Sequence, residues 1–159
     1  MGARPRRVVA VDDLAFRTAS RADLPAILTM LAADSLGATR ESAGDPAYEA
    51  AFDQIDADPR NTLVVADRAG DVVGTMQLTY IPGLSHRGGE RMQIEAVRVR
   101  ADQRGRGLGH QMIQWAVDQA RERGCRLVQL TTNKSRADAH RFYESLGFTA
   151  SHEGMKLPL

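Results

Sequence analysis

Cysteine is nearly absent from this chain. Cys125 is the single cysteine among 159 residues, which excludes an internal disulfide and favours a reducing, cytoplasmic location. Because apolar Leu127 and Val128 follow it closely, Cys125 is interpreted as a buried, inert thiol rather than a reactive one. No apolar run approaches the ~20 residues that a membrane span needs.

An excess of charge of one sign is also lacking. The formal net charge is +1, so no general attraction to nucleic acid or to a membrane surface is expected. Residues 1–10 include several arginines but no long apolar core, so they do not form a secretory signal. We expect residues 1–13 to be a disordered leader and residues 14–159 to be one domain.

Periodicity and turn signals predict an α/β fold with a mixed sheet covered by helices. Strands are predicted at 14–18, 63–66, 72–81, 92–99 and 126–131, with two further short strands near Phe148 and at 155–157. Helices are predicted after a Ser20/Asp23 capping box, from about Pro46, over 108–123 and around 139–146. The segments 37–44 and 82–90 are interpreted as loops.

The strand at 92–99 has an irregular apolar pattern. Met92 and Ile94 share one parity, whereas Val97 and Val99 have the other. One extra residue near Glu95, a β-bulge, would bring all four onto one face and open a slot beside the strand. A regular strand that is apolar on both faces explains the pattern equally well.

The segment Arg104-Gly105-Arg106-Gly107-Leu108-Gly109 joins this strand to the next helix. Alternating glycines let the backbone approach a bulky group, and the helix N-terminus behind them favours an anion, most naturally a phosphate. A plain tight turn is the alternative. The dinucleotide fingerprint fails because His110 stands at its third glycine, and the nucleotide P-loop fails because the chain contains no Gly-Lys pair.

These residues resemble the GCN5-related N-acetyltransferase (GNAT) family. Arg104-x-x-Gly107-x-Gly109 is similar to that family's pyrophosphate-binding signature, and the run from Ala139 to Phe148 is similar to its closing segment. The resemblance implies a single domain with a mostly antiparallel sheet, whose bulged central strand splays from its parallel neighbour. It also implies acetyl-CoA as co-substrate and, by analogy, a homodimer. No cluster in the sequence has metal-ligand spacing, so no metal is expected.

The resemblance assigns roles to individual positions. The expected cofactor-binding residues are Val97, Arg98, Val99, Arg104, Gly105, Arg106, Gly107, Leu108, Gly109 and Asn133. Any single arginine among them also fits a solvated surface charge, and Asn133 also fits a turn or helix cap.

Acyl transfer to an amine needs a base for the ammonium proton and a donor for the leaving thiolate. Tyr143 is the expected acid, although its ring also fits core packing beside Phe142. Glu95 is the candidate base because it lies at the suspected bulge, and a solvent-facing strand position is the equal alternative. Transfer of the proton through water, instead of directly to a side chain, is the alternative route.

The choice of acceptor is less visible in the sequence. Asp45, Glu49 and Asp53 recur every four residues and line one helix face, which fits a solvated acidic surface or a rim that attracts a cationic amine. We expect acetyl transfer to a primary amine of a small molecule within a ternary complex. The alternatives are a non-catalytic acyl-CoA-binding module and a protein or peptide N-acetyltransferase.

Overall fold

The structure is a computed structural model that describes residues 13–34, 38–39, 41–42 and 44–159. Most of the expected leader lies outside the described residues. The chain divides into two compact units, one that ends at Gln129 and one that comprises Leu130–Leu159, and each is described by itself.

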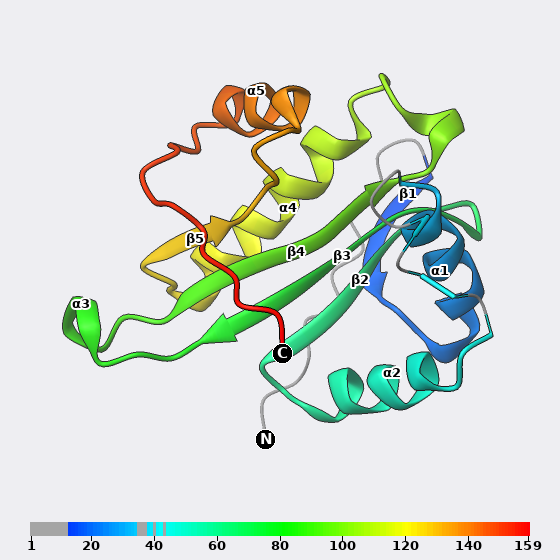
Figure 1. The fold of residues 1–159 in the computed structure, drawn as a ribbon, viewed down its shortest axis with the longest axis horizontal. Helices are drawn as coiled ribbons and strands as arrows, with labels where there is room; N and C mark the ends of the chain where they lie inside the picture. The colour runs from blue at the N-terminus through cyan, green and yellow to red at the C-terminus, as the bar shows by residue number, and fades with distance from the viewer. Residues whose placement is uncertain (1–12, 35–37, 40, 43) are drawn as a thin grey trace. The chain divides into compact units, whose positions relative to one another are not determined.

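The elements follow one another along the chain as shown in Figure 1. The strands are β1 (Leu14–Thr18), β2 (Asn61–Arg68), β3 (Asp71–Ile81), β4 (Arg91–Val99) and β5 (Leu127–Leu130). The α-helices are α1 (Leu24–Ala32), α2 (Ala47–Ala57), α3 (Ser85–Gly88), α4 (Leu108–Arg123) and α5 (Ala137–Ser145), with short 3-10 turns at η1 (Arg21–Asp23) and η2 (Ala101–Gln103).

The five strands form one sheet in the order β1-β2-β3-β4-β5. The first three pairs are antiparallel. β5 runs parallel to β4, because Arg126 N–H donates to Glu90 O (2.8 Å) and Gln129 Nε2 donates to Gln93 Oε1 (2.6 Å), so partner numbers rise together. The sheet is therefore mixed and mostly antiparallel, as expected.

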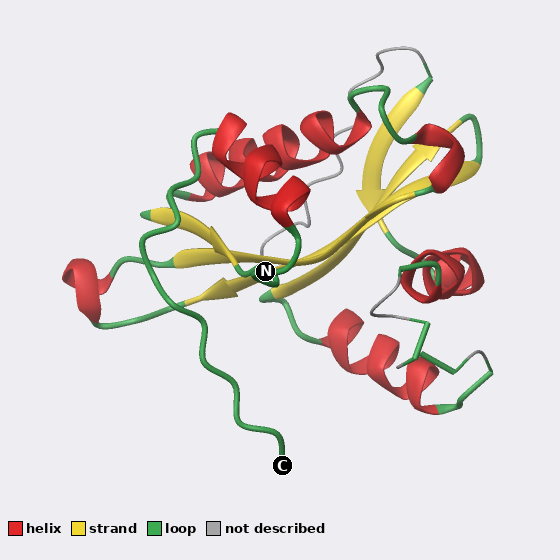
Figure 2. Ribbon diagram, turned by 45° about the horizontal axis from the view of Figure 1, so that its top comes forward, coloured by secondary structure: helices red, strands yellow, loops and turns green. Residues whose placement is uncertain are grey.

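Helix α4 covers one face of the sheet, whereas α1 and α2 cover the other (Figure 2). The α4 face holds the largest buried side chains, because alternate residues of β3 and β4 point toward that helix. This core includes Met76, Leu78, Met92, Ile94, Met112 and Ile113, each at most 2% exposed. The opposite face has a smaller apolar cluster of Ala19, Ile27, Phe52 and Val65.

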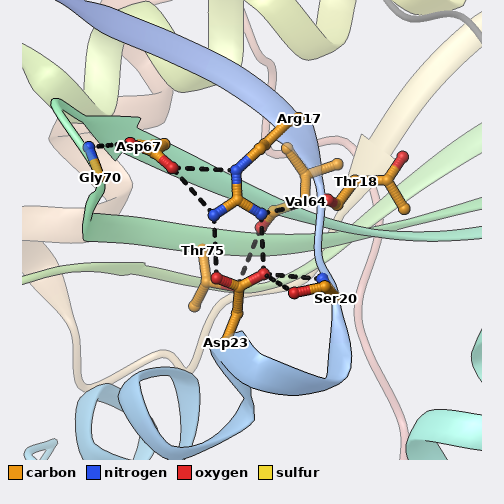
Figure 3. A network of polar contacts seen from close by, with 8 residues as sticks. All are labelled: Arg17, Thr18, Ser20, Asp23, Val64, Asp67, Gly70 and Thr75. Carbon is orange, nitrogen blue, oxygen red and sulfur yellow. Dashed lines mark hydrogen bonds and ion pairs between the residues drawn. The ribbon is translucent and has the colours of Figure 1, made fainter.

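An arginine network fastens the start of α1 to the sheet (Figure 3). Arg17 of β1 donates to both oxygens of Asp23, at 2.7 and 2.9 Å, and its Nε donates to Asp67 at 2.9 Å. Asp23 also accepts from the main-chain N–H and the hydroxyl of Ser20, so the predicted capping box is present. Chiefly through the Arg17 hydrogen bond, the pKa of Asp23 is lowered to about 2.

Several sequence predictions hold at the level of single turns. Ala69 and Gly70 have φ of 52° and 93°, the pair of positive values that a tight hairpin turn between twisted strands requires. Helix α4 covers the predicted range, and Gly124, at φ 82°, caps its end through N–H bonds to Ala120 O and Arg121 O.

The two short C-terminal strands are a wrong prediction. Residues 146–159 contain no strand; the amide of Phe148 instead donates to Tyr143 O (3.1 Å) at the end of α5. An amide used to close a helix is not available to a ladder, and Pro158 has no N–H to donate. The expected loop at 82–90 also contains one irregular helical turn, α3, in which His86 and Arg87 have positive φ.

Membrane-spanning helices are absent from the described part of the chain: none of its helices combines the required length with the required apolar character.

Candidate functional site

The middle of β4 contains the predicted β-bulge. Glu95 pairs with Gln77 and Arg98 pairs with Thr75, so between these two pairs β4 contains one more residue than β3. Ala96 takes the left-handed conformation, at φ 52°, that this extra residue requires. Such a φ costs an L-residue roughly 1–2 kcal/mol, so the surrounding ladders enforce the distortion. The bulge returns Val97 and Val99 to the buried face of the strand. Met92 and Ile94 lie on that face and are 0% and 2% exposed.

The bulge lies where β4 loses its second neighbour. Arg126 lies beside Glu90 and Gln129 lies beside Gln93, so within this unit β5 accompanies β4 only as far as Gln93. The part of β4 from Glu95 to Val99 therefore extends past the end of β5. Its β5-side edge is not covered by a β5 residue, which agrees with the predicted splaying of these two strands.

Main-chain oxygens on this part of β4 accept hydrogen bonds from arginine side chains. Val97 O accepts from Arg98 Nη1 at 2.9 Å, and Val99 O accepts from Arg104 Nε at 3.2 Å. Arg104 is exposed, so its contact with Val99 O can exchange for that of a ligand amide without disturbing the sheet, whereas Arg98 is largely buried and is held by Asp34. The geometry suits an elongated ligand that carries amide groups.

The glycine loop leads from β4 into α4. Gly105 and Gly107 have φ of 73° and 80°, and a Cβ added at either would meet no protein atom within 4 Å. The conformation alone therefore demands glycine there, and the space beyond the backbone is open. Gly109 belongs to α4 and is helical, so its role differs from that of the other two.

The first turn of α4 offers unpaired N–H groups to this open space. The main-chain ladder begins where Gln111 N–H donates to Gly107 O at 3.1 Å, so the preceding amides of the turn have no helical acceptor. No acidic residue lies in the first turn to compete for them. The positive end of the helix dipole adds to this preference for an anion.

The arginines around the loop divide into two pairs. Arg98 forms an ion pair with Asp34 (3.1 Å) in which both side chains are largely buried, and Arg100 binds Asp102 through two hydrogen bonds. The latter contact holds the pKa of Asp102 below its usual value. Among the described residues Arg104 and Arg106 form no ion pair, and both are exposed at the loop. They are the cations best placed to meet an anionic ligand.

Glu95 is exposed and stands on the sheet face opposite α4, directly across from Gln77. It borders the bulge, as expected. Its exposure gives water access to the carboxylate, so direct proton transfer and transfer through water both fit the geometry.

The remaining two predicted site residues, Asn133 and Tyr143, lie in the second unit. Asn133 Oδ1 accepts from Ser135 N (2.9 Å) and from Ser135 Oγ (2.8 Å), which is the turn role that the sequence left open. Tyr143 packs edge-on against Phe142 and Phe148, with ring centroids 5.1 and 5.9 Å away. This packing fixes the ring and is compatible with a reactive hydroxyl at its tip.

The acidic face of α2 is partly neutralised within the protein. Arg21 forms ion pairs with Glu49 and with Asp53, and its guanidinium lies over the ring of Phe52 at 5.5 Å. Asp45 accepts from the N–H of Ala47 at the start of the helix. Less negative charge is therefore available to attract a cationic acceptor than the sequence suggests.

Sequence reasoning missed two features of this region. One is the Arg98–Asp34 ion pair, which joins residues far apart in the chain and leaves no local pattern. The other is a set of uncharged polar side chains beside Glu95, which comprises Asn61, Gln77, Thr79, Gln93 and Gln129. The alternation of Thr75, Gln77 and Thr79 within an otherwise apolar strand was the signal that could have found it.

Known proteins share both the sequence and the fold of this chain. A model of the acetyltransferase (GNAT) family matches residues 28–148. The chain belongs to this family. The match includes the bulged strand, the glycine loop and α5, which are the segments that carry the resemblance in the sequence.

Individual relatives agree with this membership. The GNAT chain is 31% identical over 140 residues to an L-methionine sulfoximine/L-methionine sulfone acetyltransferase of Pseudomonas aeruginosa, covering 85% of the chain and 80% of that protein. It is 37% identical over 95 residues to an aminoalkylphosphonate N-acetyltransferase of Salmonella typhimurium, covering 60% of the chain and 61% of that relative, which is less than two thirds of its length.

A solved structure from Bacillus halodurans, described as a transcriptional regulator, superposes with a TM-score of 0.88 at 46% identity. The superposition covers 92% of the GNAT chain and 99% of that protein. The fold assignment of the chain therefore stands on both sequence and structure.

The GNAT family uses acetyl-CoA, and the residues present fit that molecule. Two left-handed glycines with open space at Cβ, free amides at the α4 N-terminus and exposed Arg104 and Arg106 suit its phosphates. The main-chain acceptors Val97 O and Val99 O suit amide donors along its arm, Val99 O most readily because its donor Arg104 is exposed.

Proposed function

We propose that this GNAT chain is an acetyl-CoA-dependent N-acetyltransferase that acetylates a primary amine of a small molecule by direct transfer within a ternary complex. The observation that carries the proposal is that the β4 bulge and the glycine loop are adjacent in the chain. Main-chain oxygens that can accept from ligand amides therefore precede a loop that suits phosphate groups. The names of the Pseudomonas and Salmonella relatives, whose acceptors are small amines, support an acceptor of that size.

In the proposed reaction the amine nitrogen attacks the thioester carbonyl, and the carbon–sulfur bond breaks. Glu95 takes the ammonium proton, directly or through a water molecule, before the attack. The Tyr143 phenol gives a proton to the leaving thiolate, and the second proton of the nitrogen, which is lost as the amide forms, passes through water and restores the phenol. The cofactor is held by Val97–Val99, by the loop from Arg104 to Gly109 and by Asn133.

Direct transfer is favoured because no activated thiol is available for an acyl-enzyme. Burial is the main cause that raises the pKa of the Cys125 thiol, whereas a nucleophilic cysteine needs a lowered pKa. A two-step mechanism through Cys125 would give parallel double-reciprocal lines and would fail in Cys125→Ser. We expect intersecting lines and an active variant.

The experiment that tests the proposal is thiol release from acetyl-CoA across an amine panel, with the N-acetyl product identified by mass. We expect Tyr143→Phe to lower kcat by about 100-fold, and Glu95→Gln to lower kcat/KM by at least about 100-fold, because proton transfer contributes on that scale. Glu122→Gln, at an exposed position near the end of α4, is the matched control and should keep full activity.

Three results would contradict parts of this assignment. Full activity in Tyr143→Phe would remove the acid role from that residue. Binding of acetyl-CoA without thiol release for any amine would instead favour a non-catalytic acyl-CoA-binding module. A peptide acceptor preferred over every small amine would favour the protein or peptide N-acetyltransferase alternative.

A cationic acceptor belongs to the same proposal and has a separate test. If the α2 face attracts a second positive charge, turnover of a polyamine should fall as salt rises, because screening shortens the reach of surface charges. An unchanged rate would dismiss the α2 face as a steering surface. The cytoplasmic location and the homodimer remain predictions, and the dimer is checked by the mass of the particle in solution.

A further inference from the structure

The sheet face that carries Glu95 changes character along β3. Val73 and Thr75 are 1% exposed on this face, whereas Gln77 and Thr79 are half-buried. The α4 face of the same strand remains apolar throughout. The polar residues join partners from three other strands to form what we call the polar patch, which consists of Asn61, Gln77, Thr79, Gln93 and Gln129.

Hydrogen bonds inside the polar patch fix its side chains. Asn61 Oδ1 accepts from Gln77 Nε2 (3.2 Å) and from Thr79 Oγ1 (2.7 Å), and Asn61 Nδ2 donates to Asp58 at 2.8 Å. On the neighbouring strands Gln129 Nε2 donates to Gln93 Oε1 at 2.6 Å. A glutamine amide carries two donors and an acceptor with two lone pairs, so each glutamine keeps capacity for a ligand.

The polar patch adjoins the proposed base. Gln77 is the direct cross-strand partner of Glu95, which places the two Cβ atoms ~5 Å apart. Gln93 lies two residues before Glu95 on the same face, about 7 Å away along the strand. An amine whose nitrogen is held at Glu95 therefore has its substituents over Gln77 and Gln93, and a small molecule is long enough to reach both.

The chemistry of the polar patch is uncharged. All five members are amides or a hydroxyl, Arg98 on the same face is paired with Asp34 at 3.1 Å, and the acidic residues Glu49 and Asp53 of α2 pair with Arg21. Side chains that both donate and accept suit hydroxyl or amide groups, which do the same. They carry no charge of their own for a second ammonium or a phosphate, and the carboxylate that adjoins them, Asp58, already accepts from Asn61 Nδ2 and from the main-chain N–H of Arg60.

We infer that the polar patch selects the acceptor: the preferred substrate is a small primary amine that carries neutral hydroxyl or amide groups on the carbons next to the carbon that bears the reacting nitrogen. This inference rests on the proposed function, since it takes Glu95 as the place where the amine is deprotonated. Gln77, Thr79 and Gln93 are specificity-determining residues, and Asn61 and Gln129 position them.

The test compares matched acceptors with wild-type protein. 2-Amino-1,3-propanediol is compared with isopropylamine, and glucosamine with cyclohexylamine, each as kcat/KM per unit of free base. 1,4-Diaminobutane supplies a second cation and 2-aminoethylphosphonate supplies an anion. We expect each hydroxylated amine to exceed its apolar partner by at least about tenfold, because polar sites reject analogues that leave them unpaired.

Variants then assign the preference to the polar patch. Thr79→Val and Gln93→Leu should raise KM for the hydroxylated amines about fivefold each, the scale of one lost neutral hydrogen bond. The values of kcat, of KM for acetyl-CoA and of kcat/KM for the apolar amines should stay unchanged, which a merely structural defect would not allow. Gln93→Asn should keep part of the preference. Gln114→Leu, on an exposed position of α4, is the matched control.

Each remaining outcome overturns the inference. Equal rates for matched amines, or a uniform loss across the panel in the variants, would show that the polar patch does not read the acceptor. A strong preference for the diamine or the phosphonate would assign specificity to charge. No turnover of any amine, with acetyl-CoA still bound, would refute the proposed function itself and is distinguished by that binding.

Discussion

Asp23 shows how one residue couples local structure to stability. Its carboxylate caps the first turn before α1 and holds Arg17, which in turn holds Asp67 of β2. The Arg17 contact is the main cause that lowers the pKa of Asp23 to about 2, from an ordinary 3.8. The folded state therefore binds fewer protons at this site than the unfolded state, and the stabilisation is present above the ordinary pKa.

This linkage predicts a pH window for Asp23. The stabilising contribution should be complete above about pH 4 and should be lost as pH falls toward 2, because the unfolded carboxyl is protonated first. Asp23→Asn should cost roughly 1 kcal/mol at pH 7, the typical value of a lost cap, and should flatten the pH dependence in that window. Urea unfolding at several pH values measures both; an identical pH slope in the variant would contradict the linkage.

At the scale of single residues, the sequence predicts local positions in turns and strands better than it predicts contacts between residues that are far apart in the chain. The place of Gly107 in the loop before the helix and the place of Glu95 beside the bulge follow from local spacing, so they could be predicted. The partners of Arg98 and Arg21 could not, because each ion pair joins residues that only the folded chain brings together. The neutralisation of the α2 acidic face is therefore visible only in the structure.

At the scale of elements, the β4 bulge is the feature whose removal is most informative. Ala96 is the additional residue, and without it the apolar side chains Met92, Ile94, Val97 and Val99 follow strict alternation on one face. Deletion of Ala96 should therefore give a regular strand that still folds. It should also relieve the positive φ, so the melting temperature should hold or rise.

The same deletion should damage the binding of acetyl-CoA. A regular strand no longer turns its Val97 and Val99 carbonyls toward the uncovered edge, so we expect affinity to fall by at least about tenfold, or ~1.4 kcal/mol. Ala96→Gly is the control, since glycine adopts the same φ without strain and keeps the bulge. Titration calorimetry measures both; unchanged affinity after the deletion would show that the bulge is not part of the site.

The bounds of elements with a strong apolar periodicity or a clear turn signal could be predicted closely, whereas short apolar runs without such signals were assigned wrongly. The α4 range and the hairpin turn at Ala69-Gly70 follow from local signals that the fold keeps. The C-terminal strands were wrong because short apolar runs specify a strand only where a ladder partner exists. In the structure the Phe148 amide closes α5, while Met155 and Leu157 are 94% and 85% exposed.

At the scale of the whole molecule, the proposed donor site and the proposed acceptor site use different residues. The bulge, the loop and the start of α4 lie in the unit that ends at Gln129, and they concern the acetyl donor. The polar patch lies in the same unit and concerns the acceptor. Family membership supports the former, whereas the latter carries the proposal about which amine the protein acetylates.

The central claim is that the glycine loop binds acetyl-CoA, and Gly107 and Gly124 allow a matched test. Both cap α4, one at each end, with φ of 80° and 82°, and a Cβ at either meets no protein atom within 4 Å. Alanine should therefore strain both positions equally, by roughly 1 kcal/mol. Only at Gly107 would the new methyl group point into the proposed phosphate cradle.

The most direct measurement is a calorimetric titration of acetyl-CoA and NAD into wild-type protein, Gly107→Ala and Gly124→Ala. The account predicts one acetyl-CoA site per chain, no binding of NAD, an affinity at least about tenfold weaker in Gly107→Ala, and wild-type affinity in Gly124→Ala. Equal affinity in the two variants, or binding of NAD as tight as that of acetyl-CoA, would contradict it.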